Sequence, residues 1–287
     1  MNSRTRITSY MQQHKQATRP QLATALGLSL VSTNAAVAAL VKKDILIPGS
    51  TISSGGGRPV QVYHFNPQHG AAVLVTAEAE AHCTRLHYEV LDLYGSVIEE
   101  KEARFVHLHG ESLEEWLDAT ARHHRLQRIC LPPGLGGIMA AHLQQRYGCE
   151  VCELSEAEAL AARQEETLVL LLRRGQPPLG AMNRNGHITP CPLLHLLSMP
   201  QDWESLDYSD HTLVEEMIAR LLQLVTCTLT PWHIKLYSDF WNDRLVSRIN
   251  FNLSTKLRGI SIPPQLHYAT ITPDKIVSQR RLLSARH

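Results

Sequence analysis

Small polar side chains stand at the start of an apolar segment near the N-terminus of this 287-residue sequence, and their hydroxyl and amide groups suit hydrogen bonding to a ligand. Ser32, Thr33 and Asn34 begin that segment, and Lys42 and Lys43 stand near its end. Hydroxyl and amide groups form hydrogen bonds with base edges in the DNA major groove. Lysine ammonium groups contact phosphates. The spacing therefore predicts a helix that touches bases with its start and phosphates with its end.

Two helices joined by a tight turn are predicted to position these residues. The first covers Arg19–Leu26 and the second Leu30–Lys43, with an earlier amphipathic helix before them. The residues that begin and end the two helices are Thr18 with Gln21 as a capping box, Gly27 as a left-handed cap, and Ser29 as an N-cap. Two helices separated by a short turn with glycine are typical of a helix-turn-helix.

A β-hairpin is predicted after the second helix. Ile45–Ile47 and Val60–Phe65 have the composition of short strands, and Ser50–Pro59 between them is rich in Gly and Ser. Arg58 would stand near the base of this wing, where an arginine can enter the minor groove. The full set of residues that we expect to contact DNA is Arg19, Ser29, Ser32, Thr33, Asn34, Lys42, Lys43 and Arg58.

Positive charge is concentrated in the same part of the chain. Residues 1–70 contain seven Lys or Arg and one acid, a net charge of +6, whereas the remainder carries −5. A basic head on a mildly acidic body suits binding to a polyanion. A small structural domain that touches no nucleic acid is the alternative interpretation of the same pattern.

The N-terminal segment resembles the ROK family of bacterial repressors, open reading frames and sugar kinases. The matching stretches are Thr18–Ala23, Leu26–Ser29 and Gly56–Pro59, the last followed by Phe65-Asn-Pro67. The resemblance continues more weakly through Ile129–Gly134 and Ser155–Glu158. It implies an α/β, multi-domain fold: an N-terminal winged helix-turn-helix followed by a degenerate actin-like body of two lobes.

Alternating strand and helix patterns favour α/β lobes independently of any family. We expect a DNA-binding domain over residues 1–67, a first lobe over 71–165, and a second lobe over 166–287 that mediates dimerisation.

Catalytic residues of the family kinases are missing from the matching positions. Val73–Glu80 lacks the glycines with which a phosphate loop approaches its ligand, and Arg173–Gly180 contains two prolines, which remove amide donors. Glu156 stands where the resemblance implies a catalytic aspartate. We therefore expect no enzyme activity and a pseudokinase body. A ligand pocket involving Glu78, Ser155 and Glu156 is the remaining small-molecule site that we consider.

No metal site or cofactor is expected. Cys149 and Cys152 have CxxC spacing, but a structural zinc site needs a second pair. His187, Cys191 and His195 have helical spacing, which Pro190 and Pro192 interrupt. The six cysteines are expected to be reduced thiols.

The expected function is sequence-specific transcriptional regulation, as a repressor, by a cytoplasmic protein. The polar N-terminus and the lack of an eighteen-residue apolar run argue against secretion and a membrane span. The expected partners are double-stranded DNA, a second copy of the chain in a homodimer or higher oligomer, and a small-molecule or protein effector. Two alternatives stay open: a degenerate sugar kinase with residual activity, and a protein-interaction module that antagonises a related repressor.

Overall fold

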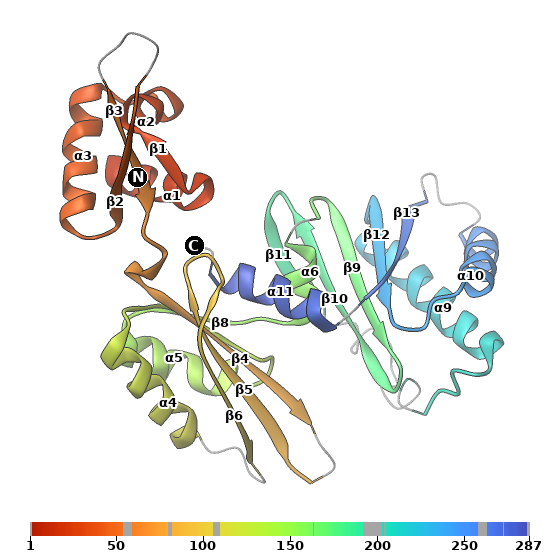
Figure 1. Cartoon of the computed structure of the whole chain (residues 1–287). Coiled ribbons are helices and arrows are strands. Elements are labelled where there is room, and N and C mark those ends of the chain that lie inside the picture. The colour runs from red at the N-terminus through yellow and green to blue at the C-terminus, as the bar shows by residue number, and fades with distance from the viewer. Residues whose placement is uncertain are drawn as a thin grey trace. The chain divides into compact units, whose positions relative to one another are not determined.

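The computed structural model describes residues 2–53, 59–79, 82–105, 110–162, 164–191, 203, 205–257, 263–271 and 273–285 (Figure 1). The chain divides into two compact units. One comprises Met1–Cys152 with Ser284–His287, and the other comprises Glu153–Leu283. Within the described residues no single helix is long and apolar enough to span a membrane, although one sharply bent pair, Arg19–Leu26 with Leu30–Lys42, meets the criterion by length and composition.

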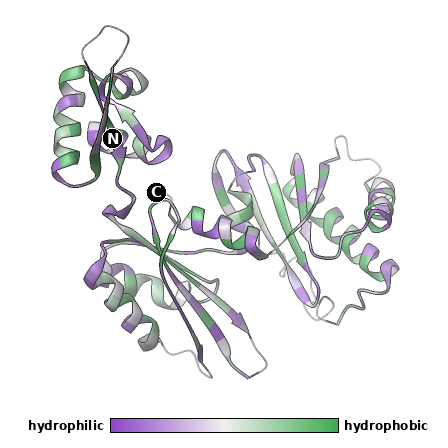
Figure 2. Ribbon diagram, viewed as in Figure 1, coloured by the Kyte–Doolittle hydropathy of each residue, from purple (hydrophilic) through white to green (hydrophobic). Residues whose placement is uncertain are grey.

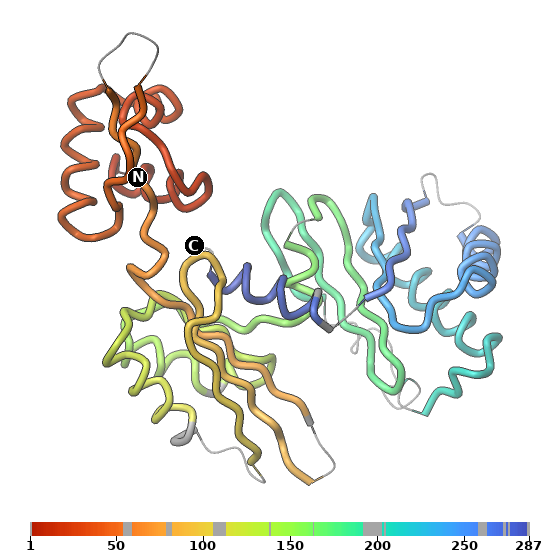
Figure 3. The backbone as a smooth tube through the Cα atoms, viewed as in Figure 1, coloured from red at the N-terminus to blue at the C-terminus, as the bar shows by residue number. Residues whose placement is uncertain are grey.

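The first unit begins with a head, residues 2–66, that contains three helices and a small sheet. Its elements are α1 (Ser3–His14), β1 (Gln16–Thr18), α2 (Arg19–Leu26), α3 (Leu30–Lys42), β2 (Leu46–Ile52) and β3 (Val60–Phe65). The sheet has the order β1-β3-β2 with antiparallel pairs. Figure 3 follows the backbone from α1 through α3 into β2 and β3. The two predicted helices and both predicted strands are present, although the first strand continues past its predicted end at Ile47 to Ile52.

The head has its own apolar core. Ile7 and Met11 of α1 meet Leu22 of α2 and Val37 of α3, and all four side chains are fully buried. Residues four apart lie on one face of a helix, so α1 and α3 each present one stripe to this core. Figure 2 shows α3 as a largely hydrophobic helix. Its solvent side is mixed, since Leu30, Val31, Asn34 and Lys42 are all exposed.

A five-stranded sheet follows in the first unit. Its elements, after the short 3₁₀ helix η1 (Pro67–His69), are β4 (Ala71–Ala79), β5 (Thr84–Asp92), β6 (Val97–Phe105), α4 (Gly110–His123), β7 (Leu126–Leu131), α5 (Gly136–Tyr147) and β8 (Glu150–Glu153). The strand order is β6-β5-β4-β7-β8, with β4 antiparallel to β5 and parallel to β7. Residues of α4 and α5, including Leu117 and Leu143, pack with strand residues such as Tyr88 and Ile129 in one cluster.

The second unit repeats this strand order. Its elements are α6 (Glu156–Ala161), β9 (Thr167–Arg173), β10 (Gln176–Arg184), β11 (His187–Cys191), α9 (His211–Leu229), β12 (His233–Ser238), α10 (Asp243–Lys256), β13 (Gln265–Thr270) and α11 (Pro273–Ser284). The order β11-β10-β9-β12-β13 corresponds position by position to the first sheet. The mixed α/β architecture expected from the sequence is confirmed.

Strand β9 shows why the second unit has two cores. Leu168 and Leu170 pack with α9 and α10, whereas Val169 and Leu171 pack with residues of α6 and α11. Successive side chains of a strand point to opposite faces, so a continuous apolar run marks a strand covered on both sides. Helix α6 thus belongs to the second unit, and the boundary lies at residues 152 and 153 instead of the expected 165 and 166.

Candidate nucleic-acid interface

The turn between α2 and α3 is built by the capping residues that the sequence predicts. The backbone N–H of Thr18 donates to Gln21 Oε1 at 2.8 Å, and the N–H of Gln21 donates to Thr18 Oγ1 at 3.4 Å. Gly27 then ends α2 with φ +61°, a left-handed conformation in which a side chain would be strained. The two helices change direction by 119°, an angle found in helix-turn-helix pairs.

Ser29 serves the backbone of α3. Its Oγ accepts a hydrogen bond from the Ser32 N–H at 3.1 Å, which satisfies one of the unpaired amides at the start of the helix. Ser29 is exposed, so the N-cap stands at the surface. Its first role is to begin the helix at the right residue.

Thr33 corrects the predicted set of base-contacting residues. Its side chain is 0% exposed, and its Oγ1 donates to the Ser29 carbonyl at 2.9 Å. Thr33 lies four residues before Val37 and therefore continues the buried stripe of α3. A buried hydroxyl with an internal acceptor cannot contact base edges, so Thr33 is a core residue.

Asn34 and Ser32 remain at the surface of the first two turns of α3. Asn34 is exposed, and its amide has no hydrogen bond within the described part of the chain. Ser32 is half-buried, with its Oγ 3.3 Å from the Oγ of Ser3. Leu30 and Val31 are 56% and 79% exposed, an unusual position for two large apolar side chains. This end of α3 thus offers an amide and an apolar surface together, which match the adenine edge and the thymine methyl group.

The N-terminus of α1 lies beside this end of α3, and the sequence analysis did not assign it a role. Asn2, Ser3 and Arg4 line a hollow of about 440 Å³ together with Ser32 and Ala35. Arg4 is exposed and adds a positive charge at this place. The only signal in the sequence was the count of basic residues, because the contact between α1 and α3 is a matter of packing.

The remaining basic residues of the predicted set lie in different surroundings. Arg19 is half-buried, with its guanidinium carbon 5.1 Å from the centre of the Tyr63 ring. This cation–π contact fixes the guanidinium next to β3. Lys42 and Lys43 are exposed at the far end of α3, roughly 15 Å along the helix from Ser32. Arg58 lies outside the described residues.

The three residues considered for a ligand pocket are each engaged within their own unit. Glu78, in the first unit, pairs with Arg85 at 3.0 Å. In the second unit Ser155 Oγ accepts from the Glu158 N–H at 3.2 Å in a capping box. Glu156 pairs with Arg173 Nη2 at 2.7 Å, so its carboxylate is neutralised by a neighbour on β9.

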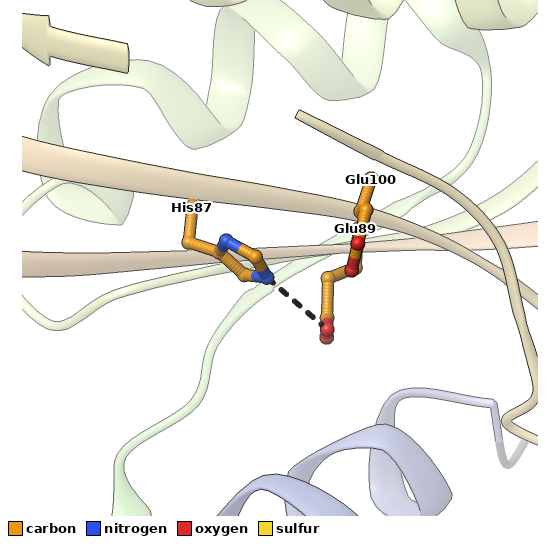
Figure 4. A group of neighbouring side chains, drawn as sticks. All are labelled: His87, Glu89 and Glu100. Atoms are coloured by element: carbon orange, nitrogen blue, oxygen red, sulfur yellow. Dashed lines mark hydrogen bonds and ion pairs between the residues drawn. The ribbon is translucent and has the colours of Figure 1, made fainter. Parts of the chain in front are cut away.

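A polar cluster that the sequence analysis missed lies on the first sheet (Figure 4). His87 Nε2 is 3.3 Å from Glu89 Oε1, and Glu100 stands opposite Glu89 on β6. One ligand atom of each of the three residues lies within 4.8 Å of the others. This donor set suits a divalent cation such as Zn²⁺ or Mn²⁺. Glu89 is only 1% exposed, and its carboxylate already has a partner in His87 Nε2.

Comparison with known proteins gives a likeness in fold. No protein-family model and no curated protein sequence matches the chain. A solved ROK-family transcriptional regulator, a homologue of the E. coli MLC protein, is similar with a TM-score of 0.55 at 11% identity, covering 93% of this chain and 91% of its own. A ROK hexokinase from Thermus thermophilus is similar with a TM-score of 0.48 at 15% identity, covering 74% of this chain and 98% of its own. A ROK protein from Streptococcus pneumoniae, solved in complex with sucrose, is similar with a TM-score of 0.47 at 12% identity, covering 74% of this chain and 97% of its own.

The likeness to the ROK regulator extends into the head. The part of the chain that it leaves out is 7%, or about 20 of the 287 residues. The head alone contains more than three times that number, so most of it must be matched. The chain therefore shares the fold of this regulator along most of its length.

Proposed function

We propose that the chain is a sequence-specific DNA-binding transcriptional repressor whose head is a winged helix-turn-helix. The observation that carries this proposal is the start of α3, where the Asn34 amide has no partner within the described residues and stands after a 119° bend. In a helix-turn-helix the second helix enters the major groove with its N-terminal residues. Val31, three residues before Asn34 and therefore on the same side of α3, would then meet thymine methyl groups.

Charge and fold support the same proposal. Residues 1–70 carry a net charge of +6, which attracts the phosphate backbone and makes binding depend on salt. Arg4, Lys42 and Lys43 are exposed around α3 and are the proposed phosphate contacts. The fold is similar to that of a ROK transcriptional regulator, and the similarity includes most of the head.

A symmetric dimer is the proposed DNA-binding form. One α3 helix contacts few base pairs, whereas two helices related by a two-fold axis can enter successive major grooves about 10 base pairs apart. The body would hold the two heads at that spacing and respond to a small-molecule or protein effector. The bound site should then contain an inverted repeat.

The body is proposed to be non-catalytic. Glu156, which stands where the resemblance places a catalytic base, is paired with Arg173. Pro177 and Pro178 lie within β10 directly after the turn at Gly175, and neither has an N–H for a phosphate.

The test is a selection of binding sites from random double-stranded DNA with the full chain, followed by affinity measurements on the selected site. We expect an inverted repeat bound with a dissociation constant on the order of 10 nM at physiological salt. Asn34→Ala should weaken binding at least ~10-fold and relax the preference at one base pair of each half-site. Arg58→Ala should weaken binding to all sequences.

Gln13→Ala is the matched control, since Gln13 is exposed on the same head in α1 and is not proposed to touch DNA. No enriched sequence, or an affinity that Asn34→Ala and Gln13→Ala change equally, would overturn the DNA-binding proposal. Saturable ATP turnover with any hexose in a coupled assay would instead support a kinase. Capture of a related repressor without DNA, together with failure of the selection, would support an interaction module.

A further inference from the structure

A cavity of about 570 Å³ lies within the first unit, where the head meets the first sheet. Its head wall includes Thr8 and Gln12 of α1 and Phe65 of β3. Its opposite wall includes Arg125 and Tyr147. This volume falls in the range of small-molecule sites, which often form where two structural parts meet.

Hydrogen bonds on both sides fix the shape of this cavity. The Leu93 N–H donates to the Pro67 carbonyl at 3.0 Å, and the Ala71 N–H donates to the Arg125 carbonyl at 2.9 Å. Gln12 Nε2 donates to the carbonyl of Ala285 at 3.1 Å, so α1 is attached to the end of the chain as well. The walls are therefore preformed and do not need a ligand to bring them together.

The charges in the cavity wall do not cancel. Glu150 is paired with Arg128, whose Nε and Nη2 lie 3.0 and 2.6 Å from Glu150 Oε2. Arg125 is exposed to the cavity mouth and has no ion pair within the described part of the chain. His69 and His124 add two imidazoles to the same wall. The charge without an ion-pair partner is thus the Arg125 guanidinium, and a ligand that pairs with it must be an anion.

We propose that this cavity binds a small organic anion, a carboxylate or a phosphate ester, whose acidic group pairs with Arg125. Apolar wall residues such as Ile45, Phe65 and Leu93 would cover the carbon part of the ligand. Because the ligand touches α1 and β3 on one side and Arg125 on the other, it holds the head in one orientation on the sheet. Any effect of the bound anion on DNA affinity rests on the proposed function. The binding of the anion itself is independent of the proposed function.

His69 should make the affinity for the anion depend on pH, which an isolated surface arginine would not do. Burial lowers the pKa of His69, and the charges of Arg125 and Lys43 lower it further, while Asp44 raises it. An anion at Arg125 would favour the imidazolium form. Binding then takes up a proton at His69, so affinity rises as the pH falls below about 6.5.

The experiment uses inorganic phosphate as the probe, titrated into the full chain at constant ionic strength and followed by the histidine ring protons in NMR. We expect saturable shifts at His69 with a dissociation constant on the order of 1 mM. Arg125→Ala should weaken binding at least ~10-fold, and Arg125→Lys less, because lysine keeps the charge but not the paired donors. His69→Gln should remove the rise in affinity below about pH 6.5 and leave the pH dependence that comes from the ionisation of phosphate itself.

Arg122→Ala is the matched control, because Arg122 is exposed near the same end of α4 and does not line the cavity. The inference is overturned if the wild-type chain shows no saturable shift, or if Arg122→Ala and Arg125→Ala weaken binding equally. Thermal unfolding of each variant verifies that Arg125→Ala is folded.

A second measurement separates this inference from the proposed function. DNA affinity is measured with and without phosphate at the same ionic strength, in the wild-type chain and in Arg125→Ala. A phosphate effect that Arg125→Ala abolishes supports the coupling. DNA binding without Arg125-dependent phosphate binding contradicts the inference alone, whereas phosphate binding without DNA binding contradicts the proposed function alone.

Discussion

Arg6 of α1 donates a hydrogen bond from its Nη2 to the carbonyl oxygen of Leu26 at 2.5 Å. Leu26 is the last residue of α2, where carbonyl groups lack helical partners and the helix dipole is negative. A guanidinium at this point satisfies one carbonyl and ties α1 to the turn before α3. This bond therefore helps to set the direction in which α3 leaves the head.

Arg6→Ala should destabilise the head. Loss of a charge-assisted hydrogen bond to a helix end is expected to lower the free energy of unfolding by about 1–2 kcal/mol. The measurement is urea unfolding of the full chain, followed by hydrogen exchange of amides in α2 and α3. Arg4→Ala is the control, since Arg4 is exposed on the same helix. Equal unfolding curves for both variants would show that the Arg6–Leu26 contact is unimportant.

Thr33 and Asn34, neighbours in sequence, should respond to mutation in opposite ways. Thr33→Val removes a buried hydroxyl from the bond to Ser29 and is expected to cost about 1 kcal/mol of stability without changing base preference. Asn34→Ala should leave stability within about 0.5 kcal/mol and change base preference. Thermal unfolding and a binding-site selection on each variant measure both effects. A base preference altered by Thr33→Val would contradict its placement in the core.

Lys42 should contribute to DNA binding through phosphate alone. Its removal in Lys42→Ala is expected to weaken binding uniformly across sequences and to reduce the slope of log K against log salt by about 0.9. The measurement is an anisotropy titration at several salt concentrations. Lys256→Ala, at the end of α10 in the second unit, removes the same charge and should leave the slope unchanged. An unchanged slope in Lys42→Ala would exclude the predicted phosphate contact.

The sequence predicted the elements of the head because their signals are local. Thr18, Gly27 and Ser29 define helix ends within a few residues. The prediction that Thr33 contacts bases is wrong, although its spacing from Val37 and Leu40 already places it on the buried stripe. At a helix start, helical periodicity is therefore a better guide to exposure than the polarity of a small side chain.

Contacts between distant residues could not be predicted in this way. The pair formed by Glu156 and Arg173 joins α6 to β9, and the cavity at Arg125 needs the head and the sheet together. In the sequence, Cys149 and Cys152 have CxxC spacing. The structure places Cys152 on β8 next to Cys130 on β7, because neighbouring strands bring side chains together irrespective of sequence separation.

Cys130 and Cys152 form a thiol pair with an Sγ–Sγ distance of 3.5 Å. Hydrogen bonds from the Cys152 thiol and from Ser284 lower the pKa of Cys130, and the same contact raises the pKa of Cys152. Burial raises the pKa of the nearby Cys149 thiol. A thiolate is the attacking species in disulfide formation, so we expect Cys130 to act as the nucleophile of the pair.

Treatment with diamide, an azo compound that oxidises pairs of thiols, should convert Cys130 and Cys152 into a disulfide. The thiolate of Cys130 adds to the azo group of diamide. The Cys152 thiol then attacks the Cys130 sulfur and releases diamide as its hydrazine form, so that diamide gains the two hydrogens that the protein loses. Peptide mass spectrometry under non-reducing conditions should find the Cys130–Cys152 peptide pair. The Cys152→Ser variant should form no such link, whereas Cys149→Ser should form it as the wild type does. A dominant Cys149–Cys152 link in the wild-type chain would show that sequence spacing, and not the neighbouring strands, decides which thiols react.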